Sequence, residues 1–458
     1  MKKVVNILSI IFVILLFYST KNSDMLSLTV SFSMFILYNS IFSTTSIQTN
    51  NYKIFKYSLL SIFILGIPLT IISYLTGDIL NIEKLNIINI FMTISVITNI
   101  IIKLTKEYLN NINYKKLSNN LFNIYTFSTL IVKIILTILF FNVFKTTNYI
   151  NIILLYSVDI FIFIILSIIS YILVFKKIKV KEDKNTKINI KEITNVLITN
   201  KKNAIYNLIS TSYIYTSIII LYYILSNKYN YSYNNVSVYI TNTYFYGLIL
   251  IYYIHIIIKK YLNINIKEDF NNNFNKTIKV LLTIIILLTV ISKPLSYLIV
   301  GSSTNILVNL IPLLFTYTIY DFVINTNMFY NKEKNIIIIL VVGLIIKIMF
   351  EIPFINAIYR MGYSLALGDI LSIVLGMIIT LTIGIILIKK KLKLNLLNNF
   401  NESLNIIYQN IIYALVLILF TLIVKIDTNT IISSLLVIIF YIFITILFQL
   451  IRRILNKK

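Results

Sequence analysis

Apolar residues occur along the chain in blocks of about 20 that are separated by short polar segments. About 20 apolar residues in a helix, at a rise of about 1.5 Å each, cross a hydrocarbon core of roughly 30 Å. A search with a window of about 19 residues finds fourteen such blocks. They cover residues 4–20, 26–46, 55–76, 85–104, 121–144, 150–175, 204–226, 236–258, 278–298, 304–326, 335–355, 361–388, 405–425 and 429–451. The pattern predicts an all-α integral membrane protein with about fourteen transmembrane helices.

The basic residues distinguish the two sides of the predicted membrane. With the N-terminus inside, 32 of the 41 Lys and Arg residues lie in inner segments, six in outer loops, and Lys133, Lys293 and Lys347 within spans. Because cytoplasmic loops carry the excess of Lys and Arg, we expect a multi-pass protein of the cell membrane with both termini cytoplasmic. Topology and attraction to anionic inner-leaflet lipid explain the net charge of +25, so no nucleic-acid partner is expected.

Composition also argues against a soluble enzyme. The chain is 58% hydrophobic and 12% charged, with a mean hydropathy of +0.87. It has no Cys and one His, which excludes thiolate and histidine-rich metal sites. Neither a P-loop glycine-lysine pattern nor a Ser/His/Asp constellation is present. We therefore expect no catalytic residues, no metal and no cofactor.

The longest inner segment divides the chain. Residues 176–203 are its most polar part and carry nine lysines. We expect a basic cytoplasmic linker here, between a six-helix N-terminal lobe at 1–175 and a six-helix C-terminal lobe at 204–388. Two further helices and a basic tail follow at 389–458. The outer loops are short, about 5 to 10 residues each.

Two hairpins carry charges inside predicted spans, where each charge costs about 2.5 to 3.5 kcal/mol on an insertion scale. In the first, Lys133 lies 14 residues before a turn centred near Thr147 and Asp159 lies 12 after it, so the two charges are at nearly the same depth. In the second, the spans are separated by a break from Glu351 to Gly362.

A turn near residues 354–357 places Lys347 about ten residues before it in this second hairpin, and Asp369 about twelve after. The lysines of the two hairpins are 214 residues apart and the aspartates 210 apart. These similar offsets indicate a parallel repeat of six helices, of the kind found in two-lobed transporters.

The intramembrane charges have two interpretations. Each lysine and aspartate could neutralise one another and clamp a hairpin, or they could line a water-filled cavity. In such a cavity lysines would bind an anionic headgroup, and an acid would take a coupling cation or proton. Glu351, one turn beyond Lys347, is an alternative partner for that lysine, and Asp321 on the tenth span could join the cavity. The candidate substrate-binding residues are Lys133, Asp159, Asp321, Lys347, Glu351 and Asp369.

Three stretches carry a resemblance to a known family. Residues 329–366 combine a short loop, an apolar helix ending in Lys347, a break, and a Gly-x-x-x-Ala helix start from Gly362 to Ala366. Residues 279–301 and 43–60 add a ninth-helix pattern and a join between helices two and three. In these features the chain resembles the multidrug, oligosaccharidyl-lipid and polysaccharide exporter (MOP) superfamily, in particular the fourteen-helix flippases of the MurJ and stage V sporulation protein B kind.

The resemblance implies two six-helix lobes arranged in a V, with two extra C-terminal helices. It implies a flippase, with membrane lipids around it, that moves an undecaprenyl-diphosphate-linked saccharide from the inner to the outer leaflet by alternating access. The saccharide would be a precursor of cell wall or surface polysaccharide. The first two spans contain neither Arg nor Gly, unlike those of lipid II flippases, so the resemblance carries over Lys347 alone.

Three other functions remain open at this point. A cation-coupled multidrug exporter of the same superfamily would usually have twelve helices. An integral membrane glycosyltransferase would use Asp24, in the first outer loop, as its catalytic acid, although the short outer loops leave little room for a catalytic domain. A degenerate homologue that no longer transports would explain the uncharged first two spans.

Overall fold

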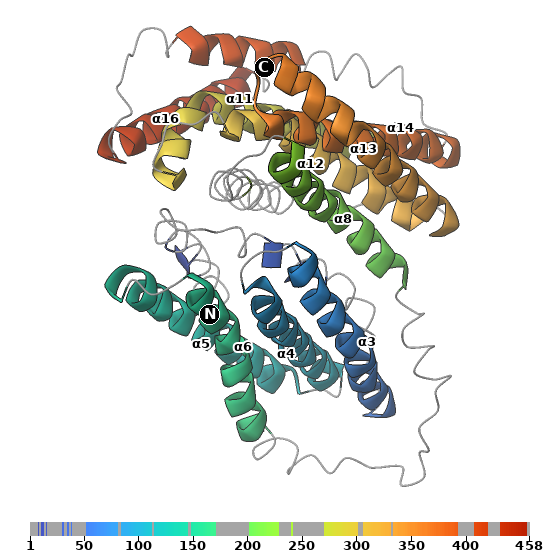
Figure 1. Ribbon diagram of the computed structural model, residues 1–458. Helices are drawn as coiled ribbons and strands as arrows, with labels where there is room; N and C mark the ends of the chain where they lie inside the picture. The colour runs from blue at the N-terminus through green and yellow to red at the C-terminus, as the bar shows by residue number, and fades with distance from the viewer. Residues whose placement is uncertain are drawn as a thin grey trace. The chain divides into compact units, whose positions relative to one another are not determined.

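The computed structural model describes ten continuous stretches of the chain, together with Ile240 and isolated residues between 8 and 38. The stretches are 52–80, 84–111, 114–144, 148–170, 201–228, 270–300, 306–330, 333–392, 407–419 and 431–455. All ten are helical apart from short turns, and the described residues contain no strand (Figure 1). The predicted all-α membrane fold is confirmed.

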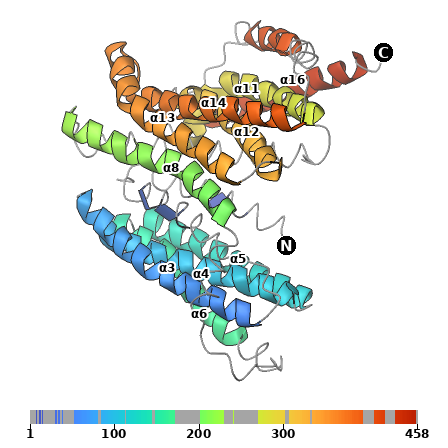
Figure 2. The same ribbon diagram turned by 90° about the vertical axis from the view of Figure 1, so that its right-hand side faces the viewer.

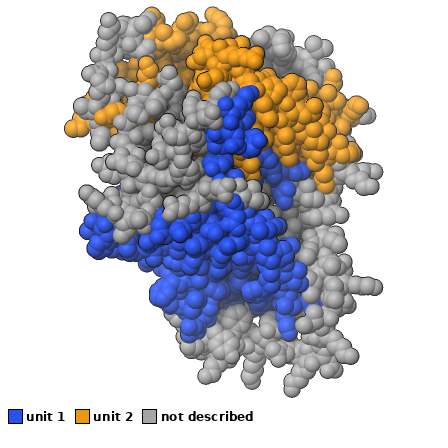
Figure 3. Space-filling model, viewed as in Figure 1, with its two compact units in different colours: residues 1–218, 222–238 blue, residues 219–221, 239–458 orange. Residues whose placement is uncertain are grey.

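The chain divides into two compact units (Figure 3). The first comprises residues 1–218 and 222–238, and the second comprises residues 219–221 and 239–458. Most of the predicted linker, residues 176–200, lies outside the described residues. The predicted lobes at 1–175 and 204–388 therefore stay predictions.

Four long helices form the described core of the first unit. They are α3 (Tyr52–Ile79), α4 (Leu85–Asn111), α5 (Lys115–Leu136) and α6 (Asn148–Ser170). α5 continues as a π-helix, η2 (Thr137–Val143), and α8 (Lys201–Tyr223) continues as η4 (Ile224–Lys228). Helix α4 packs against α3, α5 and α6, and Figure 2 shows these helices side by side. Half of the residues in the apolar, membrane-length stretch of α4 are buried, against 22%, 17% and 39% in the same stretches of α3, α5 and α6. Helix α4 is therefore the central one of the four.

The described residues of the second unit form five long helices and one short one. These are α11 (Phe270–Val300), α12 (Ile306–Tyr330), α13 (Glu333–Arg360), α14 (Leu365–Leu392), α16 (Ile431–Leu455) and the short helix Ile407–Leu419. Helix α14 packs against α13 and α12, while α11 packs against α12 and α16. In the apolar, membrane-length stretches of α12 and α14, 61% and 50% of the residues are buried. These two neighbouring helices are therefore the most buried of the unit's described long helices.

Nine of the described helices are long and apolar enough to cross a membrane. They match nine of the fourteen predicted blocks, from 55–76 to 150–175, from 278–298 to 361–388, and 429–451. The block at 204–226 is helical as α8, and the block at 405–425 contains the short helix Ile407–Leu419. The blocks at 4–20, 26–46 and 236–258 lie almost wholly outside the described residues.

The predicted break between Glu351 and Gly362 is wrong for most of its length. Helix α13 continues through Pro353 to Arg360, because a proline within a transmembrane helix removes one backbone hydrogen bond without ending the helix. The chain leaves the helix after Arg360, and two residues later Gly362 has a φ of +78°. There the Gly362 and Tyr363 N–H groups donate to the carbonyls of Tyr359 and Ile358, the pattern of a glycine-ended helix.

Candidate functional site

A buried ion pair joins three helices of the first unit. The Lys133 Nζ atom on α5 lies 2.8 Å from both carboxylate oxygens of Asp159 on α6. The Ser95 hydroxyl on α4 donates to Asp159 Oδ2 at 2.6 Å. The Asp159 side chain is 5% exposed and the Lys133 side chain 18%. Lys133 and Asp159 thus lie at the same depth and in contact, as the first of the two interpretations of these charges expects.

Polar groups continue from this pair along α4 and α5. Asn99 donates from Nδ2 to the Ser95 carbonyl at 2.8 Å, and its Oδ1 accepts from the Tyr125 hydroxyl at 3.0 Å. Thr137, the first residue of the π-helix, donates to the Lys133 carbonyl at 2.7 Å. The pair is thus part of a polar seam rather than an isolated contact.

A second ion pair lies in the second unit, within helix α13. Lys347 Nζ is 2.5 Å from Glu351 Oε2, and both side chains are completely buried. This is the within-helix partner that the i, i+4 spacing predicts. The other oxygen, Glu351 Oε1, is also buried and accepts no hydrogen bond from the described residues.

The packing of α14 on α13 fixes the level of Asp369. A Cβ on Gly368 would lie 2.7 to 2.8 Å from backbone atoms of Phe354 and Ile355, so residue 368 faces them. Since the helices run in opposite directions, Asp369 is level with residues 353–354. At about 1.5 Å per residue, its backbone is about 4 Å along the axis from Glu351 and about 10 Å from Lys347. The predicted equal depth of Lys347 and Asp369 is therefore wrong, because the turn comes at residues 361–364.

Two further buried acids belong to the second unit. Asp369 on α14 is 0% exposed and Asp321 on α12 is 9% exposed. Helices α12 and α14 are joined by Asn327, whose Nδ2 donates to the Gly384 carbonyl at 3.1 Å. Asp321 accepts at its backbone carbonyl from Asn325 Nδ2 at 2.6 Å. Three buried carboxyl groups and one buried ammonium are thus carried by α12, α13 and α14.

The sequence interpretation missed the contribution of α4. Ser95 completes the carboxylate site of Asp159, and Thr93 and Asn89 form a second buried contact with α3 through Ser73, whose hydroxyl is 2.9 Å from that of Thr93. The signal was two pairs of polar residues at i, i+4 spacing in an otherwise apolar helix, Asn89 with Thr93 and Ser95 with Asn99. Each pair marks a face turned toward another helix.

This arrangement suits binding and ion exchange more than bond chemistry. In the described part of the chain, no group of three or more His, Cys, Asp or Glu side chains is placed to hold a metal ion. An ammonium has three donors, so a lysine beside a carboxylate can turn to another anion. A buried carboxylate can bind a proton or a cation instead of the lysine.

Comparisons with known proteins place this geometry in a known fold. No protein-family model matches the chain, and no curated protein matches its sequence. The solved structure of the lipid II flippase MurJ in an inward closed conformation is similar, with a TM-score of 0.62 and 16% identity over 99% of this chain and 100% of that chain.

Two states of a multidrug resistance MATE family transporter of the MOP superfamily are also similar. The inward-facing state has a TM-score of 0.53 at 15% identity, over 82% of this chain and 91% of that one. The outward-facing state has a TM-score of 0.50 at 13% identity, over 84% and 94%. All three neighbours are transporters. The chain therefore has the multi-span helical fold that MurJ shares with the MATE transporters, which confirms, at the level of fold, the resemblance found in the sequence.

Proposed function

We propose that this protein flips a polyprenyl-diphosphate-linked saccharide from the inner to the outer leaflet of the cell membrane by alternating access of its two lobes. The saccharide would be a precursor of cell wall or surface polysaccharide. The observation that carries the proposal is the extent of the likeness to the flippase, which covers 99% of this chain and all of the MurJ chain. The MATE transporter in its outward-facing state covers only 84% of this chain. Residues 389–458 are predicted to hold two helices beyond the twelve that a drug exporter usually has.

The charges support an anionic substrate. The Lys133 side chain is 18% exposed although it is paired with Asp159, so this lysine is not sealed within the helix bundle. A lysine in a span attracts a diphosphate and repels a cation. This favours a diphosphate-linked lipid over a cationic drug.

The second unit supports coupling to a proton or cation. Glu351 is completely buried, and one of its two oxygens is satisfied by Lys347 while the other accepts no hydrogen bond from the described residues. Asp369, on α14, is a second buried carboxyl group, and its backbone is about 4 Å along the helix axis from that of Glu351. A proton or a cation at Glu351 Oε1 would satisfy that oxygen. We therefore assign the coupling ion to Glu351, with Asp369 as a neighbouring buried acid.

The orientation belongs to the same proposal. We place both termini in the cytoplasm, because the basic residues alternate with the predicted loops in the positive-inside sense. The glycosyltransferase alternative depends on Asp24, which lies outside the described residues. If Asp24→Asn stopped glycan assembly while a preformed lipid-linked sugar was still translocated, the glycosyltransferase hypothesis would be correct and the flippase proposal wrong.

A flipping assay in proteoliposomes tests the proposal directly. The vesicles contain a fluorescent undecaprenyl-diphosphate monosaccharide, and a membrane-impermeant reagent measures how much of it reaches the outer leaflet. Wild-type protein should speed its appearance, and Lys133→Gln should slow it at least tenfold. Lys84→Gln, an exposed lysine of the same unit, is the matched control and should behave as wild type. Uptake of a cationic dye with no lipid flipping would make the drug exporter correct, and inactivity toward both would support a degenerate homologue.

A further inference from the structure

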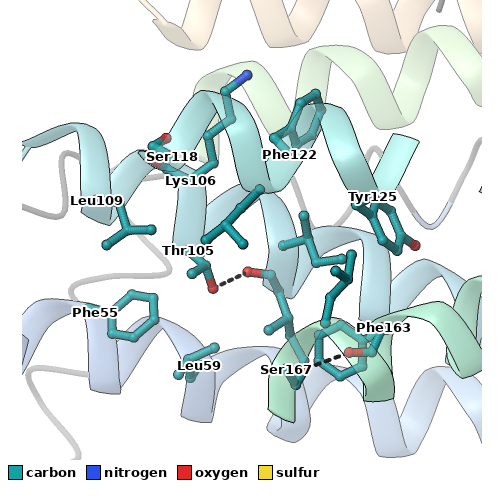
Figure 4. Close-up of a pocket in the computed structure, with 14 residues that line it drawn as sticks. Phe55, Leu59, Thr105, Lys106, Leu109, Ser118, Phe122, Tyr125, Phe163 and Ser167 are labelled. Carbon is teal, nitrogen blue, oxygen red and sulfur yellow. Dashed lines mark hydrogen bonds between the residues drawn. The ribbon is translucent and has the colours of Figure 1, made fainter. Parts of the chain in front are cut away.

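One end of the first unit contains a cavity that no part of the transport proposal uses (Figure 4). It has a volume of about 240 Å³ and is lined by 14 residues from α3, α4, α5 and α6. Ten of these residues are apolar or aromatic. Its three Ser and Thr hydroxyls donate to backbone carbonyls: Thr105 to Ile101, Ser118 to Lys106, and Ser167 to Phe163. The wall therefore offers an apolar surface.

The cationic group of this lining is Lys106. Its Nζ atom lies 3.9 Å from the centre of the Phe122 ring, and its side chain is half-buried. Figure 4 shows the lysine nitrogen directed away from the apolar side chains Leu59, Leu109 and Phe163. The cavity thus combines an apolar interior with a positive charge at its edge.

The whole end of the bundle is basic. The cavity is lined by the beginnings of α3 and α5 and the ends of α4 and α6. The lysines at these helix ends are Lys56, Lys103, Lys106, Lys115 and Lys116, against a single acid, Glu107. The described residues at the opposite end carry only Asp78 and Lys84. The charge at the cavity is complementary to an anionic group.

We propose that this cavity binds one anionic phospholipid, with an acyl chain among the apolar residues and its phosphate on Lys106. The volume is below the 300 to 1,000 Å³ of drug-sized pockets, which suits a flexible hydrocarbon chain. In the proposed orientation this end of the bundle lies at the cytoplasmic leaflet, where anionic lipids concentrate and attract nearby lysines. The lipid would hold the ends of four helices together. It is a resident ligand of the first unit, and its binding does not depend on what the protein transports.

Native mass spectrometry of the full-length protein tests the site. The protein is titrated in detergent with phosphatidylglycerol or with phosphatidylcholine of the same chain length. The wild type should retain one phosphatidylglycerol molecule more tightly than any phosphatidylcholine. Lys106→Gln should weaken that molecule about fivefold, the equivalent of about 1 kcal/mol, and should leave phosphatidylcholine binding unchanged. Lys84→Gln, at the opposite end, should change neither lipid.

A second pair of variants tests the acyl chain. Leu121→Trp fills the cavity from α5 and should abolish the tight lipid. Ile135→Trp, on the same helix but 49% exposed, is the matched control and should leave it bound. Equal binding of the two lipids by wild type, or a tight phosphatidylglycerol retained in Leu121→Trp, would overturn the proposal. So would displacement of that lipid by undecaprenyl phosphate at equal concentration, since the cavity would then belong to the lipid carrier.

Discussion

Replacing Lys133 alone should destabilise the first unit more than replacing Lys133 and Asp159 together. Asp159 accepts from the ammonium at both carboxylate oxygens and from Ser95 at one. In Lys133→Gln the carboxylate stays buried and keeps its charge, with the serine hydroxyl and at most an amide as donors. In the double variant Lys133→Gln, Asp159→Asn, the buried charge is gone and the amides can still hydrogen-bond to each other and to Ser95.

The structure sets the magnitudes. Breaking a buried ion pair by removing one partner costs about 3 to 5 kcal/mol. Lys133 is 18% exposed, so water can partly solvate the carboxylate that remains, and we expect about 3 kcal/mol, at the lower end of that range. Replacing both charges by neutral groups that hydrogen-bond should cost about 1 kcal/mol. The difference, about 2 kcal/mol, is a factor of about 30 in the equilibrium for local opening.

The absence of cysteine gives a local assay. Val158, next to Asp159, is 5% exposed, so a Val158→Cys background carries a single buried thiol. Its rate of labelling by a maleimide in detergent reports how often this part of α6 opens. Lys133→Gln should speed labelling by about two orders of magnitude and the double variant by about fivefold. Lys84→Gln should leave the rate unchanged. Equal rates in the single and double variants would show that the carboxylate is well solvated without its lysine, and would refute the reasoning.

Three further predictions follow from the helix contacts and the charges. Gly368→Ala should lower the thermal stability of the protein in detergent by more than Gly362→Ala. A Cβ at 368 would meet the α13 backbone at 2.7 Å, whereas one at 362 meets nothing within 4 Å and adds only the strain of a φ of +78°, about 1 to 2 kcal/mol; equal losses would mean that the hairpin adjusts freely. Glu351→Gln should abolish the dependence of flipping on an imposed proton or cation gradient, and a retained dependence in the proteoliposome assay would remove this carboxylate from coupling. An impermeant maleimide added to whole cells should label Lys84→Cys but not Lys115→Cys, whereas the reverse pattern would invert the proposed orientation.

The helices and the first ion pair were predictable from the sequence for simple reasons. Blocks of about 20 apolar residues have few structures open to them in a membrane except helices. Lys133 and Asp159 can be paired by counting because their hairpin turn is short: Lys133 lies ten residues before the end of η2 at Val143, and Asp159 lies eleven after the start of α6 at Asn148. Equal counts on both sides of a short turn give equal depths.

In the second hairpin, counting residues from the turn could not give the depths of the two charges. A proline at 353 gives the same local signal whether a helix ends or continues, and the choice depends on whether neighbouring helices can accommodate the proline. Here α13 continues to Arg360, so Lys347 lies thirteen residues before its end while Asp369 lies only four after the start of α14 at Leu365. The similar offsets of 214 and 210 residues therefore do not produce similar ion pairs. Ser95 was missed for a related reason, since it comes from a helix outside the hairpin.

This difference between the two ion pairs bears on their roles. Lys133 is paired with the following helix and is partly exposed, while Lys347 is paired within its own helix and is sealed. The contact between Lys347 and Glu351 lies within one helix, so by itself it does not clamp the hairpin. A fully buried ion pair with one unsatisfied carboxylate oxygen destabilises the protein, and this pair lies near the middle of α13. Such a cost is expected where a group has to change partner during the working cycle. We therefore expect the first pair to contact the substrate and the second to respond to the coupling ion, so that Lys133→Gln weakens substrate binding while Glu351→Gln leaves binding intact and removes the response to the gradient.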